Sequence, residues 1–187
     1  STLNLNGGTL TVPRLVSSQT NGRRIVNLNG GTLVAATTGV DLMGLGTGNA
    51  FAYVRSGGAI ISSGTNTVTL SQALIHATGD ASPDGGLTKQ GSGTLTLTST
   101  NTFTGDTRVQ QGTLALGPTG ALSGSTNIIV SAQATLDVAN VTNGYTLAGT
   151  RRLYGSGSVN GNVTAALGSK IFAGLDGTGY ATNTFNN

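Results

Sequence analysis

Hydrophobic and polar residues alternate along short stretches of this chain. Leu3 and Leu5 alternate with asparagines, and Leu95 and Leu97 alternate with threonines. A period of two places the apolar side chains on one face of a β-strand and the polar side chains on the other. The stretches are short and end at Asn-Gly, Gly-Gly or Ser-Gly pairs, which are typical of tight bends. The pattern therefore predicts an all-β protein made of many short strands.

The predicted strands recur along the chain. Residues 4–10 and 27–33 both read Asn-Leu-Asn-Gly-Gly-Thr-Leu, and looser copies follow. One apolar residue marks each copy, namely Leu10, Leu33, Ile60, Leu95, Leu114, Leu136 and Val159. Successive markers lie 23, 27, 35, 19, 22 and 23 residues apart. The 35-residue step contains the short alternating strand Val-Thr-Leu at 68–70. Periods of this size are typical of solenoid proteins.

Stacking the copies in register lets each strand pair with its equivalent one coil away and satisfies the backbone groups. We therefore predict a right-handed parallel β-helix (a β-solenoid) of about eight or nine coils of 19–27 residues. The seven markers should form one internal ladder, in which Leu95, Leu114 and Leu136 are fully buried. Asn, Thr and Ser should form hydrogen-bonded rows outside. A meander of antiparallel hairpins is the rival, since Asn-Gly is also a strong hairpin signal.

The chain of 187 residues is expected to form one stack. Residues 1–86 should hold the less regular coils, with a protruding loop near 76–86, and residues 87–187 the regular ones. The loop contains His76, one of the three prolines, and the aspartates Asp80 and Asp84.

Composition narrows the classes of protein. Charged residues make up only 8% of the chain, the net charge is +3, and there is no cysteine. A disulfide scaffold is thus excluded, and a helix bundle is disfavoured because Gly, Thr, Asn and Ser are poor helix formers. No apolar run approaches the ~20 residues of a membrane-spanning helix. The arginines occur as isolated pairs rather than a basic patch, which argues against a nucleic-acid partner.

From residue 87 onward the sequence is more specific. Residues 87–97 read Leu-Thr-Lys-Gln-Gly-Ser-Gly-Thr-Leu-Thr-Leu, and Asn-Thr-Phe-Thr-Gly, Thr-Arg-Val and Gly-Thr-Leu-Ala-Leu begin at 101, 107 and 112. This stretch resembles the autotransporter-associated β-strand repeat, also named the passenger-associated transport repeat. The residues that carry the resemblance are Leu87, Lys89, Gly91, Gly93, Thr94, Leu95, Asn101, Phe103, Gly105, Val109, Gly112 and Leu114. Phe103 stands where the family often has Tyr, and residues 155–174 look like the coil that often follows.

The resemblance implies a β-helix in the exported passenger of a large bacterial surface or secreted protein. It implies an extracellular or outer-surface location on a Gram-negative-type bacterium, and a role as stalk, fibre or adhesin scaffold without catalysis or cofactor. Its partners would be neighbouring repeats of the parent chain, surface glycans, or copies of itself. The chain begins inside a repeat and ends without charge, so we expect its coils to be covered by neighbours or to stack head to tail into a filament.

A polysaccharide-binding or polysaccharide-cleaving β-helix is the alternative function. It would need two or three carboxylates converging in one groove, and the candidates are Asp41, Asp80, Asp84, Asp106, Asp137 and Asp176. We expect turn-forming aspartates, with a calcium site at Asp80 and Asp84 as the lesser alternative. His76 is expected to be structural. The aromatic residues Phe51, Tyr53, Phe103, Tyr145, Tyr154 and Tyr180 should fill the interior or cover corners, with a sugar-stacking surface as the alternative.

Overall fold

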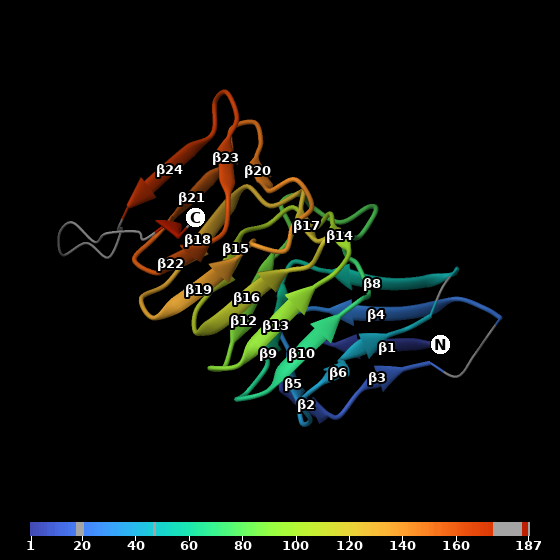
Figure 1. Cartoon of the computed structure of the whole chain (residues 1–187). Helices are drawn as coiled ribbons and strands as arrows, with labels where there is room; N and C mark the ends of the chain where they lie inside the picture. Colours follow the sequence, from blue (N-terminus) through green and yellow to red (C-terminus); the bar gives the residue numbers. More distant parts are fainter. Residues whose placement is uncertain (18–20, 47, 174–184, 187) are drawn as a thin grey trace.

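The structure is a computed structural model that describes residues 1–17, 21–46, 48–173 and 185–186. Every regular element in these residues is a β-strand. The strands stack along one axis from the N-terminal to the C-terminal coil (Figure 1), and each described sheet pairing is parallel. The parallel β-helix is therefore confirmed and the hairpin meander is wrong. The stack has about seven turns, fewer than the eight or nine predicted.

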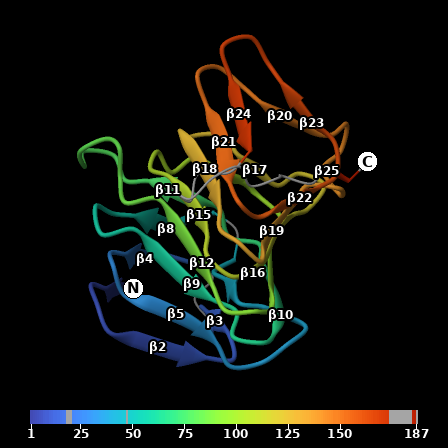
Figure 2. The ribbon, with the colours of Figure 1, turned by 90° about the vertical axis from the view of Figure 1, so that its left-hand side faces the viewer.

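Each coil contributes strands to as many as three faces, which are seen from a second side in Figure 2. The eight-stranded sheet contains β2 (Thr9–Val12), β5 (Thr32–Ala35), β9 (Ala59–Ser62), β12 (Leu87–Gln90), β15 (Thr107–Val109), β18 (Asn127–Val130), β21 (Arg152–Gly155) and β24 (Lys170–Ala173). The seven-stranded sheet contains β6 (Val40–Asp41), β10 (Thr67–Leu70), β13 (Thr94–Leu97), β16 (Gly112–Leu116), β19 (Ala134–Asp137), β22 (Ser158–Asn160) and β25 (Phe185–Asn186).

The third face changes along the stack. Its first part is a four-stranded sheet of β1 (Thr2–Leu5), β4 (Arg24–Leu28), β8 (Ala50–Val54) and β11 (Leu74–His76). Farther on, β14 (Thr100–Asn101) pairs with β17 (Ala121–Leu122), and β20 (Tyr145–Leu147) pairs with β23 (Val163–Ala165). A short pair, β3 (Leu15–Val16) with β7 (Met43–Gly44), lies in the N-terminal coils. The third face thus becomes discontinuous beyond β11.

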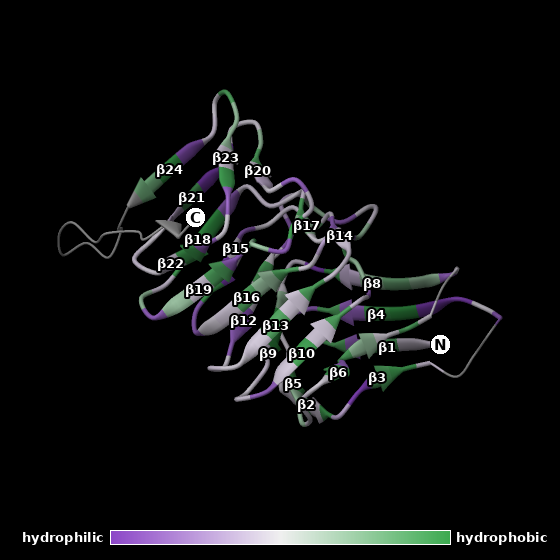
Figure 3. Ribbon diagram, viewed as in Figure 1, coloured by the Kyte–Doolittle hydropathy of each residue, from purple (hydrophilic) through white to green (hydrophobic). Residues whose placement is uncertain are grey.

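Alternation of side chains along the strands builds the core. In β13 the leucines at 95 and 97 are fully buried, while the threonines at 94 and 96 are half-buried. Figure 3 shows hydrophobic and paler residues alternating along β10 and β13. Leu95 pairs in register with Leu114, Leu114 with Leu136, and Leu136 with Val159. This part of the predicted ladder, including the burial of its three leucines, is confirmed.

Six of the seven markers nevertheless lie in two ladders instead of one. Leu10 pairs with Leu33 in the eight-stranded sheet, and Leu33 continues to Ile61. Ile60 is in register with Thr32 on the outer side, so its predicted place in the interior is wrong. The reason is that coils of unequal length carry their extra residues at the corners, and a shift of one residue turns a strand side chain to the opposite face.

Outside the core, polar residues form rows in register, and the predicted hydrogen bonds along a row occur between asparagines. Thr67, Thr94, Thr113 and Thr135 lie in register along the seven-stranded sheet. On the four-stranded sheet, the Nδ2 of Asn27 donates to the Oδ1 of Asn4 at 2.6 Å. These rows repeat with the coil spacing, about 4.8 Å, and leave the interior to apolar side chains.

Candidate functional site

The side chain of Lys89 points into the interior. It occupies an inward position of β12, in register with Ile61 on one side and Val109 on the other, and its exposed fraction is 0%. Its Nζ donates hydrogen bonds to the carbonyl oxygens of Gln90 at 2.9 Å, Gly91 at 2.7 Å and Gln111 at 3.0 Å. The ammonium thereby joins two successive coils at the corner after the eight-stranded sheet. Burial lowers the pKa of Lys89 to about 8.

Two glycines of the motif let consecutive coils approach closely at this corner. Gly91 has a φ of 81°, in the left-handed region that disfavours a side chain. A Cβ at Gly93 would lie 2.0 Å from the carbonyl oxygen of Asn66 in the preceding coil. The Gly-x-Gly spacing is therefore required by backbone contact between coils. Gly105 and Gly112, the other motif glycines, also face the preceding coil's backbone.

Asn101 and Phe103 occupy the next corner. Asn101 is 1% exposed and accepts a hydrogen bond from the backbone amide of Leu74 at 2.9 Å. Its Nδ2 donates to the carbonyls of Ser99 at 2.8 Å and Ala121 at 3.0 Å, so one side chain connects three coils. Phe103 fills the interior beside it and is 0% exposed. Leu87, Leu95, Val109 and Leu114 are the buried apolar members of the motif, and Thr94 is half-buried.

A buried carboxylate lies in the segment between β11 and β12. The side chain of Asp84 is 0% exposed. Its Oδ1 accepts hydrogen bonds from the backbone amides of Gly86 and Gly105, both at 2.9 Å. Its Oδ2 accepts one from the backbone amide of Thr104 and contacts the Nδ1 of His76, also at 2.9 Å. The turn-forming role of Asp84 and the structural role of His76 agree with these contacts.

The carboxylate of Asp84 should make the free energy of unfolding decrease at acid pH. Burial by itself would raise its pKa, but the hydrogen bonds from Thr104, Gly105, His76 and Gly86 outweigh burial and lower it. Because the folded pKa is below the unfolded one, the carboxylate contributes its full stability above about pH 4, and this is lost as pH falls through the folded pKa. We expect Asp84→Asn to cost about 1–2 kcal/mol at pH 7 and to flatten the acid limb of unfolding free energy against pH, measured by urea titration. An unchanged acid limb would contradict this role.

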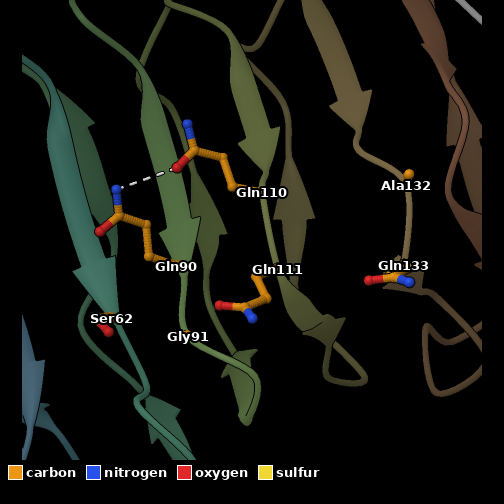
Figure 4. A pocket seen from close by; sticks show the side chains of 7 residues that line it. All are labelled: Ser62, Gln90, Gly91, Gln110, Gln111, Ala132 and Gln133. Atoms are coloured by element: carbon orange, nitrogen blue, oxygen red, sulfur yellow. Dashed lines mark hydrogen bonds between the residues drawn. The ribbon is translucent and has the colours of Figure 1, made fainter. Parts of the chain in front are cut away.

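A polar hollow of about 530 Å³ lies on the outer side of the Lys89 corner. It is lined by Ser62, Gln90, Gly91, Gln110, Gln111, Ala132 and Gln133, which are drawn in Figure 4. The Nε2 of Gln90 donates to the Oε1 of Gln110 at 3.1 Å. Three of the lining residues are those whose carbonyls Lys89 binds from beneath. The sequence pattern did not single out these glutamines, because glutamine at the end of a strand carries no catalytic or metal-binding signature.

Comparison with known protein families bears on this corner. Residues 87–116, which run from β12 through β16, match the passenger-associated transport repeat family. They are a passenger-associated transport repeat. The predicted resemblance is confirmed. Within that repeat, Lys89 and Asn101 bind backbone carbonyls between coils, and Gly91 and Gly93 allow the coils to approach closely.

The transport repeat lies within a longer similarity. The chain is 34% identical over 140 residues to the adhesin BmaC autotransporter of Brucella suis biovar 1 (strain 1330), a match that covers 73% of this chain and 4% of that relative. The chain thus spans a small part of that protein's length. No solved structure matches it. The chain is a β-solenoid from the extracellular or cell-surface side of a Gram-negative-type bacterium.

The aspartates around the transport repeat are engaged separately. Asp80 forms an ion pair with Arg55 at 2.9 Å, whereas both oxygens of Asp84 are turned inward to backbone amides. The structure therefore does not support a calcium site shared by these two residues. The remaining described aspartates also have partners: Ser71 for Asp41, Arg108 and Asn127 for Asp106, and Asn160 and the amide of Ala139 for Asp137. Asp176 lies outside the described residues. Within the described ranges, no three His, Cys, Asp or Glu side chains gather as a metal site requires.

The aromatic residues divide between the interior and the outer faces. Phe103 and Tyr145 are buried, with exposed fractions of 0% and 5%. Tyr154 is half-buried on β21, and Tyr180 lies outside the described residues. The part of the chain that the structure describes has no helix long and apolar enough for a membrane span.

Phe51 and Tyr53 stack on the outer side of β8. Their ring centroids are 5.6 Å apart and their planes differ by 3°. The guanidinium of Arg23 lies 5.3 Å from the centroid of Phe51, and that of Arg55 lies 5.3 Å from the centroid of Tyr53. Ring stacking and cation–π contacts therefore engage the rings, and this pair covers a sheet face instead of filling the interior or covering a corner as predicted.

Proposed function

We propose that this segment is a non-catalytic stalk, fibre or adhesin scaffold within a large exported protein. The observation that carries the proposal is the direction of the transport repeat's polar groups. Lys89 and Asn101 donate to backbone carbonyls inside the stack, so the most specific residues of the sequence hold coils together. The adhesin relative supports a surface role for the parent. We also propose that residues 1–86 and 87–187 belong to one continuous stack.

The partners proposed for the coils follow from the apolar ladder. Leu10, in the first strand of the eight-stranded sheet, is half-buried, whereas its register partner Leu33 is 0% exposed. A further coil on that side would cover Leu10 and pair the edge of β2. We propose a neighbouring coil of the parent chain, or a second copy arranged head to tail, as this cover. Light scattering at rising concentration separates the two, because only the second gives growing particles.

A scaffold should depend on the register of its coils more than on one particular coil. Thr94 and Leu95 are in register with Thr113 and Leu114, so deletion of residues 94–112 removes one full turn and joins equivalent positions. We expect the full-length parent with this deletion to remain displayed on the cell surface at about wild-type level, because stability in a solenoid is a sum of nearest-neighbour terms. Antibody labelling of intact cells measures the display.

The matched control is deletion of residues 94–103, which ends in mid-coil and breaks the register. It should abolish display, and equal display of the two deletions would contradict the scaffold.

The alternative, polysaccharide cleavage, is tested on the purified chain with pectin, alginate and chitin, with and without calcium. We expect no turnover. A turnover that disappears in Asp80→Ala would overturn the proposal in favour of an enzyme.

A further inference from the structure

The polar hollow of Figure 4 follows the axis of the stack and is named the glutamine groove below. Ser62 belongs to β9, Gln90 to β12, Gln110 follows β15 and Gln133 follows β18, so four consecutive strands of the eight-stranded sheet contribute to it. Three coil steps of ~4.8 Å give the groove a length of about 14 Å. A site with this form suits an extended ligand more than a compact one.

The groove presents primary amides in both of their hydrogen-bonding roles. Each amide has two N–H donors and an oxygen acceptor in one plane. The bond from Gln90 to Gln110 leaves the oxygen of Gln90 and the amide hydrogens of Gln110 for another partner. Within the described chain, the side chains of Gln111 and Gln133 form no hydrogen bond to protein. The groove can therefore donate and accept along its whole length.

The absence of charged side chains from the lining of the groove argues against an ionic ligand. Its lining contains no Asp, Glu, Lys or Arg. The ammonium of Lys89 lies beneath the surface with an exposed fraction of 0% and is committed to three carbonyls. An anion such as a phosphate would need exposed cations or converging N–H groups alone. A protein partner would need aromatic or arginine anchors in a desolvated centre, and the lining has none.

The backbone of the groove is fixed before any ligand arrives. Lys89 holds the carbonyls of Gln90, Gly91 and Gln111 in one arrangement. Gln133 has a φ of 63°, a conformation that a non-glycine residue rarely adopts. Such conformations concentrate at functional sites, where the surrounding structure enforces them. Gln133 is exposed, so no buried contact of its side chain accounts for the presence of glutamine there.

We propose that the glutamine groove binds an extended, uncharged polysaccharide chain. Sugar hydroxyls donate and accept hydrogen bonds, which matches the mixed donors and acceptors of the amides. The groove has no aromatic stacking platform, so a single site is weak, with a Kd on the order of 1 mM. Many such grooves along a long passenger, or many passengers on one cell, would make the total attachment strong through multivalency. This inference goes beyond the scaffold role and does not depend on it.

Affinity electrophoresis of the purified chain tests the proposal. The probes are the neutral polysaccharides dextran, amylose, mannan and xyloglucan, with alginate and pectate as acidic counterparts. We expect at least one neutral polysaccharide to retard the chain and the acidic ones not to retard it. Retardation by the acidic probes alone, or by none of the probes, would overturn the proposal.

Two variants locate the binding. Gln133→Gly removes one amide and relieves the unfavourable φ, so its melting temperature should equal or exceed the parent's. Gln110→Ser removes a second amide from an exposed position. We expect the double variant to weaken binding at least tenfold, about the loss of 1.4 kcal/mol. Gln72→Ala is the matched control, because Gln72 lies at a different corner, between β10 and β11. Equal affinity of the double variant and the control would show that the groove is not the site.

The binding test is independent of the scaffold test. If the register-breaking deletion left display unchanged, the scaffold proposal would fail while retardation of the purified chain could still be measured. If retardation were absent while display behaved as expected, only the groove proposal would fail.

Discussion

Leu114→Asp is expected to leave the chain unfolded at room temperature. Leu114 is 0% exposed and sits in the middle of the ladder, in register with Leu95 and Leu136. An aspartate there would place an unpaired charge among aliphatic side chains, which costs several kcal/mol beyond the lost burial of leucine. A native domain has only about 5–15 kcal/mol to lose. Each coil contacts only its neighbours, so disruption of β16 also removes support from β13 and β19.

Circular dichroism and thermal melting measure this effect. The matched control is Thr113→Asp, which introduces the same side chain one position earlier in β16. Thr113 lies in the outer row of threonines, where water solvates the charge. We expect its melting temperature to stay near the parent's. If Leu114→Asp melted like Thr113→Asp, the assignment of inward and outward positions in this sheet would be wrong.

Lys89→Met is expected to destabilise the chain by about 3 kcal/mol at pH 7, because methionine fills a similar volume but removes the ammonium that donates to three corner carbonyls. The other lysine, Lys170, lies on the outer side of β24 in register with Arg152, and its side chain is exposed. Lys170→Met is therefore the control, with an expected change within about 0.5 kcal/mol. Urea unfolding measures both. Equal effects would show that the carbonyl contacts of Lys89 do not contribute to stability.

The pH dependence gives a second signature of Lys89. Its pKa is about 8 in the fold because burial disfavours the charged form, against 10.5 ordinarily. Between these values the unfolded chain binds more protons, so the unfolding free energy of the parent should rise with pH. Lys89→Met should lack this rise. Burial also raises the pKa of Tyr145 to about 12, which lowers stability only above about pH 10. The comparison is therefore made between pH 8 and about pH 10.

Lys89 and Asp84 show a common use of buried charge in this protein. Each lies at a corner where one coil passes to the next, and most of its partners are backbone groups, with His76 as an additional partner of Asp84. The backbone of a glycine-rich corner has few side chains to cover it, so its carbonyls and amides need polar partners from elsewhere. Lys89 supplies such a partner from within the transport repeat, and Asp84 supplies another from the segment just before it. At the Lys89 corner, the register is thus fixed by polar contacts with the backbone.

The sequence by itself determined the strand class, the repeat and the family. Alternation with a period of two is a local property of an extended chain, so Leu95, Thr96 and Leu97 already showed which side chains share a face. The Lys-x-Gly-x-Gly-Thr-Leu run was specific enough to indicate the transport repeat that the comparison confirmed. The burial of Lys89 was also indicated by the sequence, because Lys89 lies two residues after Leu87 and therefore points to the same face of the strand.

Only the tertiary structure decided which sheet each strand joins and what the polar residues contact. The ladders of Leu33 and Leu114 lie in different sheets although both follow Gly-Thr, because corner lengths vary and the interior face depends on the coils above and below. The contacts of Asp84 with Thr104 and the gathering of Gln90 with Gln133 join residues about one or two coils apart. Alternation within one strand fixes the side chain's face, whereas the stacking of several coils fixes its neighbours.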